Sequence, residues 1–149
     1  MILDIVTYPD PRLKEVCEPV GEVTDEIRQL AADMLETMYE APGVGLAAPQ
    51  IGIMLRLAVV DASDKRGQAV RMANPEILHE SVQFRSHEEA SPNLPGVSAH
   101  ITRPRAVTVR FLNEQGEVED RDFVGLWATS VQHQIDHLNG KVYVDHLTP

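Results

Sequence analysis

The sequence predicts one α+β domain spanning residues 1–149, with antiparallel strands packed around a central helix. Three patterns carry this prediction: an early apolar stripe at helical spacing, alternating segments typical of strands, and a late helix that bears two histidines one turn apart. A chain of 149 residues can bury roughly two-thirds of its unfolded surface, which is enough for one core. We therefore expect no second domain.

The first predicted helix runs from Asp25 to about Ala41. Thr24 precedes it as a candidate N-cap, and Pro42–Gly43 ends it. We expect its apolar face, methionines included, to pack on a core rather than to line a pocket. The residues of this face are Ile27, Leu30, Ala31, Met34, Leu35 and Met38.

Two further stretches predict strands. Residues 55–60 have the composition of a buried strand. Residues 106–112 alternate, and a polar turn at 113–117 leads into a return strand that ends at Phe123, so a hairpin is expected. The acidic stretch 117–122 is compatible with a cation site or a basic partner, but an exposed strand face explains it more simply.

Residues 125–139 predict the second helix, which stops near Gly140, a residue suited to the position after a helix end. His133 and His137 lie one turn apart on it and therefore share a face. A helix presents two nitrogens to one metal ion in this way. Pairs at this spacing also occur on ordinary core and surface faces, so the pair alone leaves both interpretations open.

Gln134 follows the first histidine directly. In the metallohydrolase pattern H-E-x-x-H this position holds a glutamate that acts as general base. A glutamine matches the size and hydrogen-bonding reach of glutamate, but its neutral amide cannot hold a proton taken from water. The metal-binding half of the pattern is present, and the proton-transfer half is not.

The segment 43–52, GVGLAAPQIG, favours the metal interpretation when it is considered with the histidine pair. Together the two segments resemble the peptide deformylase family. Its first motif, G-φ-G-φ-A-A-x-Q, is matched at every specified position, and its third, H-E-x-D-H, is matched except at Gln134. Residues 8–13, the spacing of the motifs and residues 140–147 extend the resemblance over nearly the whole chain. It implies a peptide-deformylase-like α+β fold and supplies the strand order.

The family's second motif, E-G-C-L-S, aligns with residues 89–93, and only Glu89 is shared. Ser91 stands where the family has its cysteine metal ligand, and an alcohol is a far weaker acid than a thiol of pKa roughly 8.5. Pro92 stands where the family donates a backbone N–H to the formyl carbonyl, and proline has none. Four changed residues in a row, 90–93, indicate natural divergence.

The resemblance assigns roles to individual residues. Ser91, His133 and His137 stand at the three metal-ligand positions, and the metal implied is divalent iron, zinc or nickel, bound weakly or not at all without the thiolate. Gln50 and Gln134 are the candidates for catalytic roles, since the family's first-motif glutamine faces the substrate carbonyl.

An N-terminal peptide of a nascent chain is the ligand that the resemblance implies. The glycine-bearing segment would pair with its backbone, although Gly43 and Gly45 also suit a tight turn packed by residues 47–49. Gly45 is the substrate-binding residue of that segment, and the candidate wall residues for a methionine-like side chain are Val44, Leu46, Leu126 and Thr129.

Residues 87–91 offer two possible substitute metal ligands. If this segment is extended, Glu89 and His87 lie on the same face as Ser91. An ordinary polar strand face is the simpler interpretation of both residues.

Composition limits the partners. The net charge of -10 argues against nonspecific binding to nucleic acid. No apolar run approaches roughly 18 residues and no signal-like start is present, so we expect no membrane span and a cytoplasmic location. The single cysteine, Cys17, allows no intrachain disulfide and is expected to be a small structural residue. The sequence stops at Pro149, so we expect no C-terminal helix of the kind many bacterial deformylases carry.

Three functions remain open: a working deformylase with a substitute metal ligand, a hydrolase with a changed substrate or mechanism, and a non-catalytic peptide-binding protein. Loss of one oxyanion donor costs about 10²- to 10³-fold in rate, and loss of a general base about 10²- to 10⁴-fold. Because metal, base and donor are all altered, we expect standard activity to be weak or lost.

Overall fold

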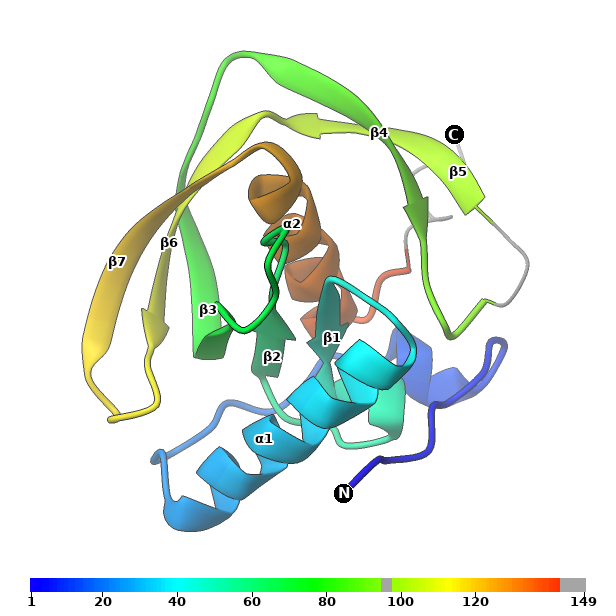
Figure 1. Cartoon of the computed structure of the whole chain (residues 1–149), viewed down its shortest axis with the longest axis vertical. Helices are drawn as coiled ribbons and strands as arrows, with labels where there is room; N and C mark the ends of the chain where they lie inside the picture. Colours follow the sequence, from blue (N-terminus) through cyan, green and yellow to red (C-terminus); the bar gives the residue numbers. More distant parts are fainter. Residues whose placement is uncertain (95–97, 143–149) are drawn as a thin grey trace.

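The computed structural model describes residues 1–94 and 98–142. In this part of the chain the strands form a five-stranded antiparallel sheet in the order β1-β2-β3-β6-β7 and a separate two-stranded ladder, β4-β5 (Figure 1). The helices are α1 (Asp25–Glu40) and α2 (Gly125–Leu138), with short 3₁₀ helices η1 (Pro11–Lys14) and η2 (Ala48–Ile51). The strands are β1 (Gly45–Ala47), β2 (Leu57–Val60), β3 (Val70–Glu80), β4 (Phe84–Ala90), β5 (Ser98–Pro104), β6 (Ala106–Leu112) and β7 (Val118–Val124).

Helix α2 runs through the middle of the fold, against the large sheet and beneath the β4-β5 ladder (Figure 1). Ten of its 14 residues are buried, so this helix is covered on nearly every side. Its apolar residues join the main core cluster with side chains from β2, β3, β6 and β7. Its polar residues face strand β1 and the β4-β5 ladder. The helix carries Ala128, Val131, Ile135 and Leu138 into this cluster.

Helix α1 confirms the sequence prediction. The hydroxyl of Thr24 caps it by accepting the amide of Ile27 at 3.3 Å. Met34 and Met38 are 0% and 1% exposed, and pack with the strands β1 and β2 in a second apolar cluster. The methionines therefore belong to the core, as their spacing indicated.

The β6-β7 hairpin is also confirmed, with Ala106 paired to Val124. Strand β2 is buried throughout but begins at residue 57, two residues later than predicted. Most of the acidic stretch 117–122 is exposed on β7, where Asp120 pairs with Arg110 at 2.8 Å. This arrangement agrees with a solvated strand face.

Strand β3 and the β4-β5 ladder were not predicted. Asn74 adopts φ of 52°, Pro75 follows it, and the pairing with β6 shifts register at this point. Proline in a strand is confined to edges and irregularities, and the bulge hides the alternation of the strand. The side chain of Asn74 stabilises the bulge through two hydrogen bonds to Val20. Its Oδ1 accepts the backbone N–H of Val20 at 2.7 Å, and its Nδ2 donates to the carbonyl of Val20 at 2.8 Å.

Three smaller expectations have different outcomes. Cys17 is 4% exposed in the main core cluster, and its amide donates to the carbonyl of Leu138 at 2.9 Å. Within the described residues, no helix has the length and apolar character needed to span a bilayer. The family-like ending at 143–147 lies outside the described residues.

We predict that Thr24→Ala lowers the free energy of unfolding by about 1 kcal/mol, because the amide of Ile27 loses its capping acceptor. Thr24→Ser keeps the hydroxyl and should remain within about 0.5 kcal/mol of the parent. Urea unfolding followed by circular dichroism at 222 nm measures both. Equal losses in the two variants would contradict a capping role.

Candidate functional site

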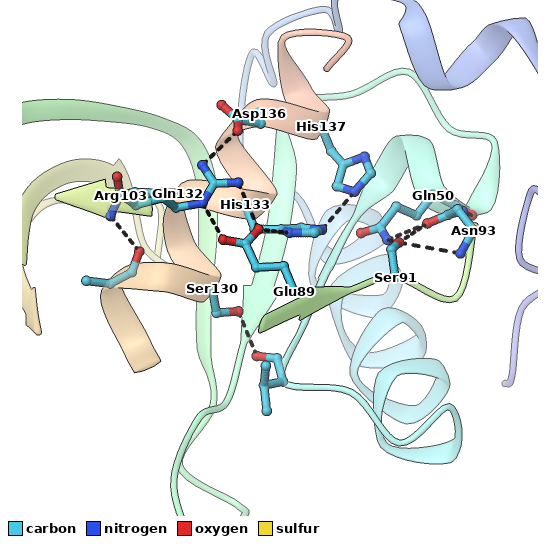
Figure 2. Close-up of polar contacts among 12 residues, drawn as sticks. Gln50, Glu89, Ser91, Asn93, Arg103, Ser130, Gln132, His133, Asp136 and His137 are labelled. Atoms are coloured by element: carbon cyan, nitrogen blue, oxygen red, sulfur yellow. Dashed lines mark hydrogen bonds and ion pairs between the residues drawn. The ribbon is translucent and has the colours of Figure 1, made fainter. Parts of the chain in front are cut away.

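Strand β4 and the short helix η2 bring polar side chains to the polar face of α2. Strand β4 carries alternate residues toward the helix, so that Glu89 is 4% exposed while its neighbours in the strand are exposed. Ser91 follows on the same side of the chain and is 7% exposed. The short helix η2 brings Gln50, which is 1% exposed, to the end of β4 (Figure 2). Segments far apart in sequence therefore meet at one buried polar site.

The two histidines converge as the helical spacing predicts. The Nε2 atoms of His133 and His137 lie 3.2 Å apart (Figure 2). Two nitrogens each about 2.0–2.1 Å from one tetrahedral metal ion would lie roughly 3.3 Å apart. The pair therefore has the geometry of two ligands of one ion, and also that of a direct hydrogen bond.

Glu89 orients the first histidine. Its Oε1 lies 2.8 Å from Nδ1 of His133, so a proton on Nδ1 leaves the Nε2 lone pair directed at His137. Burial raises the pKa of Glu89, but the hydrogen bonds from His133 and Arg103 outweigh it and hold that pKa at about 2. Burial, and then the nearby charges of His133 and Arg103, lower the pKa of His137 well below its usual range. His137 is thus neutral at pH 7, as a metal ligand must be.

Sequence reasoning missed the partner of Glu89. Arg103 on β5 donates to both carboxylate oxygens, at 2.7 and 2.9 Å, and to Asp136 at 2.8 Å. Such two-pronged pairs are among the stronger protein hydrogen bonds. The side chain of Arg103 is 6% exposed, so the network is buried and joins β4, β5 and α2. The only sequence signal was Glu89, the one residue shared with the family's second motif.

Gln50 and Ser91 belong to a second buried cluster that contains Asn93. Nε2 of Gln50 donates to Oγ of Ser91 at 3.1 Å and to Oδ1 of Asn93 at 2.5 Å. The Ser91 hydroxyl donates to the same Oδ1 at 2.9 Å. The hydroxyl that stands at the thiolate position is therefore engaged with neutral amides. Asn93 was not predicted as a site residue, and its only sequence signal was its place in the changed motif.

A cavity of about 110 Å³ opens between these elements. The predicted substrate-binding residues Val44, Gly45, Leu126 and Thr129 line it. The residues with polar side chains that share it with them include Gln50, His87, Ser91, His133 and Gln134, and Pro92 lies beside them.

Two predicted site residues do not line the cavity. The side chain of Leu46 is 1% exposed and belongs to the second apolar cluster. Successive residues of a strand face opposite sides, and Gly45 and Ala47 take the side toward α2. His137, a predicted metal ligand, is 1% exposed.

The side chains present fit a metal ion only in part. Among the described residues, no group of three His, Cys, Asp or Glu side chains is placed to hold one. The hydroxyl of Ser91 is occupied in its amide cluster, and the carboxylate of Glu89 is bonded to Arg103 and His133. The described site thus provides two nitrogen ligands and lacks a complete donor set.

Gln134 packs against backbone because Gly45 has no side chain. A Cβ at Gly45 would lie 2.4 Å from Nε2 of Gln134 and 2.5 Å from Oγ of Ser130. Oε1 of Gln134 is buried without a hydrogen-bond partner in the described part of the chain. The amide therefore occupies the position of a base but cannot take up a proton.

We predict that Gly45→Ala lowers the free energy of unfolding by about 1–3 kcal/mol, since the new methyl group must displace Gln134 and Ser130. Gly21→Ala is the matched control, because a Cβ at Gly21 meets no atom within 4 Å. Chemical unfolding compares the two variants. An unchanged midpoint for Gly45→Ala would show that the two side chains can move at no cost.

We predict that Glu89→Gln destabilises the fold by about 3 kcal/mol at pH 7, because Arg103 loses a buried carboxylate. The pKa of Glu89 is depressed in the folded state, so its stabilisation is present above about pH 4.5 and is lost as pH falls toward 2. The difference between variant and parent should shrink over that range. Urea unfolding from pH 7 to pH 3 measures it.

Glu88→Gln is the control for this experiment. Glu88 is the exposed neighbour, and its carboxylate lies 3.8 Å from His100. Surface pairs of this kind contribute about 0–1 kcal/mol. A loss for Glu88→Gln equal to that for Glu89→Gln would contradict a special role for the buried network.

Comparisons with known proteins agree with the fold and identify the family. The family model for polypeptide deformylase matches residues 2–149. A peptide deformylase of Afipia carboxidovorans is 46% identical over 149 residues, covering 99% of this chain and 87% of that protein.

Solved structures give the same result. The peptide deformylase of Legionella pneumophila has a TM-score of 0.94 at 40% identity, covering 100% of this chain and 88% of that one. A peptide deformylase of Acinetobacter baumannii with bound Met-Ala-Ser has a TM-score of 0.92 at 34% identity, covering 98% of each chain. They confirm the expected α+β fold. The chain belongs to the polypeptide deformylase family.

Proposed function

We propose that this chain is a divergent single-domain deformylase-family protein that keeps a cavity for N-terminal peptides, and in which removal of the formyl group from N-formylmethionyl peptides is weak or lost. One observation carries the proposal. Ser91, Pro92 and Gln134, the three residues that differ from the family's functional positions, all line the same cavity as His133 and Gln50. The changes are thus concentrated at one site.

Each change removes a different contribution to the same chemical step. Ser91 supplies no thiolate, and the described site keeps only two nitrogen ligands. Gln134 cannot accept a proton from water, and Pro92 has no N–H to place at a carbonyl oxygen. Residues that act on the same chemical step lose their effect together, so one remaining functional group supports little activity. We infer that metal binding is weak or absent.

The proposed ligand is the N-terminal peptide of a nascent chain. The Acinetobacter baumannii relative has been solved with Met-Ala-Ser, a peptide that begins with methionine. The cavity of this chain keeps apolar wall groups from Val44 and Leu126, with Gly45 and Thr129 beside them. We propose that they receive the first side chain of the peptide, in the cytoplasm and without nucleic acid or membrane as partner.

A second function remains supported by one observation. The 3.2 Å separation of the two histidine Nε2 atoms suits a divalent iron, zinc or nickel ion. His87 lines the cavity and lies on the same face of β4 as Glu89, so it is a candidate substitute ligand, but β4 would have to shift to bring it to the two histidines. Glu89 is less suited, because both of its oxygens are bonded to Arg103. An active deformylase with this ligand set is the alternative.

We predict that turnover of a formyl-Met peptide is at least about 10³-fold below that of a competent deformylase, because base and oxyanion donor are both altered. Metal should be substoichiometric after dialysis against a mild chelator. Turnover of roughly 1 to 10³ s⁻¹ together with one retained metal ion would favour the active alternative.

The matched rescue is the triple variant Ser91→Cys, Pro92→Leu, Gln134→Glu, which returns a thiolate, an N–H and a base. We expect it to bind stoichiometric metal and to regain measurable turnover, whereas each single reversion remains inactive. Metal content and turnover are measured on the same preparation. A triple variant that holds metal without turnover would show that the peptide groove itself has diverged.

A further inference from the structure

The amide of Gln50 lines the cavity but has no hydrogen left to donate into it. Its Nε2 carries two hydrogens, which go to Oγ of Ser91 at 3.1 Å and to Oδ1 of Asn93 at 2.5 Å. Its Oε1 accepts the amide of Ala47 at 2.8 Å. The hydrogen-bonding capacity of this side chain is therefore used within the protein.

Asn93 is at the centre of this cluster and is 0% exposed. Its Oδ1 accepts from Gln50 and from the hydroxyl of Ser91 (Figure 2). Its Nδ2 donates to the carbonyls of Val6 and of Gln50, the latter at 3.2 Å. Turning the Asn93 amide over would set N–H against N–H at Gln50 and oxygen against two carbonyls. The network itself determines that the Asn93 oxygen faces Gln50.

We propose that Asn93 is a specificity-determining residue: its side-chain carbonyl occupies the place at the Gln50 amide that the carbonyl oxygen of a formyl group would take. This inference rests on the proposed function, since it concerns the same cavity. The ligand class follows from it. The protein as it stands binds peptides with an apolar first residue and gains nothing at Gln50 from a formyl group.

The energetic reason is the burial of Asn93. A formyl oxygen that displaced the Asn93 oxygen would gain one hydrogen bond, while the displaced oxygen would lose one and remain buried. The exchange gives no net affinity. Serine, the residue of the family motif at this position, carries its oxygen one bond closer to the backbone than Oδ1 of asparagine, and this shorter reach would leave a Gln50 hydrogen available.

The test is a double-mutant cycle in metal-free protein, prepared with a chelator so that only hydrogen bonds contribute. Calorimetry measures the affinities of formyl-Met-Ala-Ser and Met-Ala-Ser, and their ratio is compared between variants. Gln50→Leu should leave the ratio unchanged in the parent. Asn93→Ser should raise the preference for the formyl peptide about 5- to 10-fold, and Gln50→Leu in that background should remove the gain.

The proposal is wrong if Gln50→Leu in the parent lowers the formyl preference 5-fold or more, because the amide would then already reach the ligand. It is also wrong if folded Asn93→Ser gains no preference. Should Asn93→Ser fail to fold, the parent and Gln50→Leu still decide the question.

A second measurement needs neither a variant nor a ligand. The side-chain amide protons of Gln50 should exchange with water at least about 100-fold more slowly than those of the exposed Gln29. Equal rates would show that the cluster is open and overturn the inference. If neither peptide binds, the proposed function fails, while the exchange rates still report whether Asn93 holds Gln50.

Discussion

The site depends on one buried carboxylate. Glu89 lies away from water, and an unpaired charge there would cost several kcal/mol. Arg103 and His133 offset that cost through hydrogen bonds to Glu89, and Arg103 also pairs with Asp136. Because these partners come from β4, β5 and α2, the ion network fastens the two-stranded ladder to the central helix. It also sets the direction of the His133 ring, and with it the orientation of the whole histidine pair.

The second cluster of the site is made of neutral groups. Gln50, Ser91 and Asn93 satisfy one another's hydrogen bonds between η2 and the end of β4. Nδ2 of Asn93 also donates to the carbonyl of Val6, so the N-terminal segment is held there too. A metal ion would connect the same segments through charged donors, whereas here amides and a hydroxyl do so. The scaffold can therefore remain intact while the chemistry of its centre changes.

Much of the fold was predictable because its signals are local. The stripe of α1, the alternation of the β6-β7 hairpin and the helix that carries His133 are read from neighbouring residues. Strand β3 was not predicted because the bulge at Asn74 breaks its alternating pattern. The β4-β5 ladder was not predicted because neither strand shows in its own sequence which strand it pairs with. The burial of Leu46 in the second apolar cluster was not predictable, because nothing in its short strand shows which face meets α2.

The sequence by itself determined which groups the site can contain: two histidines one turn apart, a glutamine in place of a base, and a serine and proline in the second motif. These are covalent facts, and no fold can return a thiolate or an amide hydrogen that the residues lack. Only the tertiary structure decided which partners these groups have. Arg103 and Asn93 reach Glu89 and Gln50 across 14 and 43 residues, and such long-range contacts leave no periodic trace in the chain.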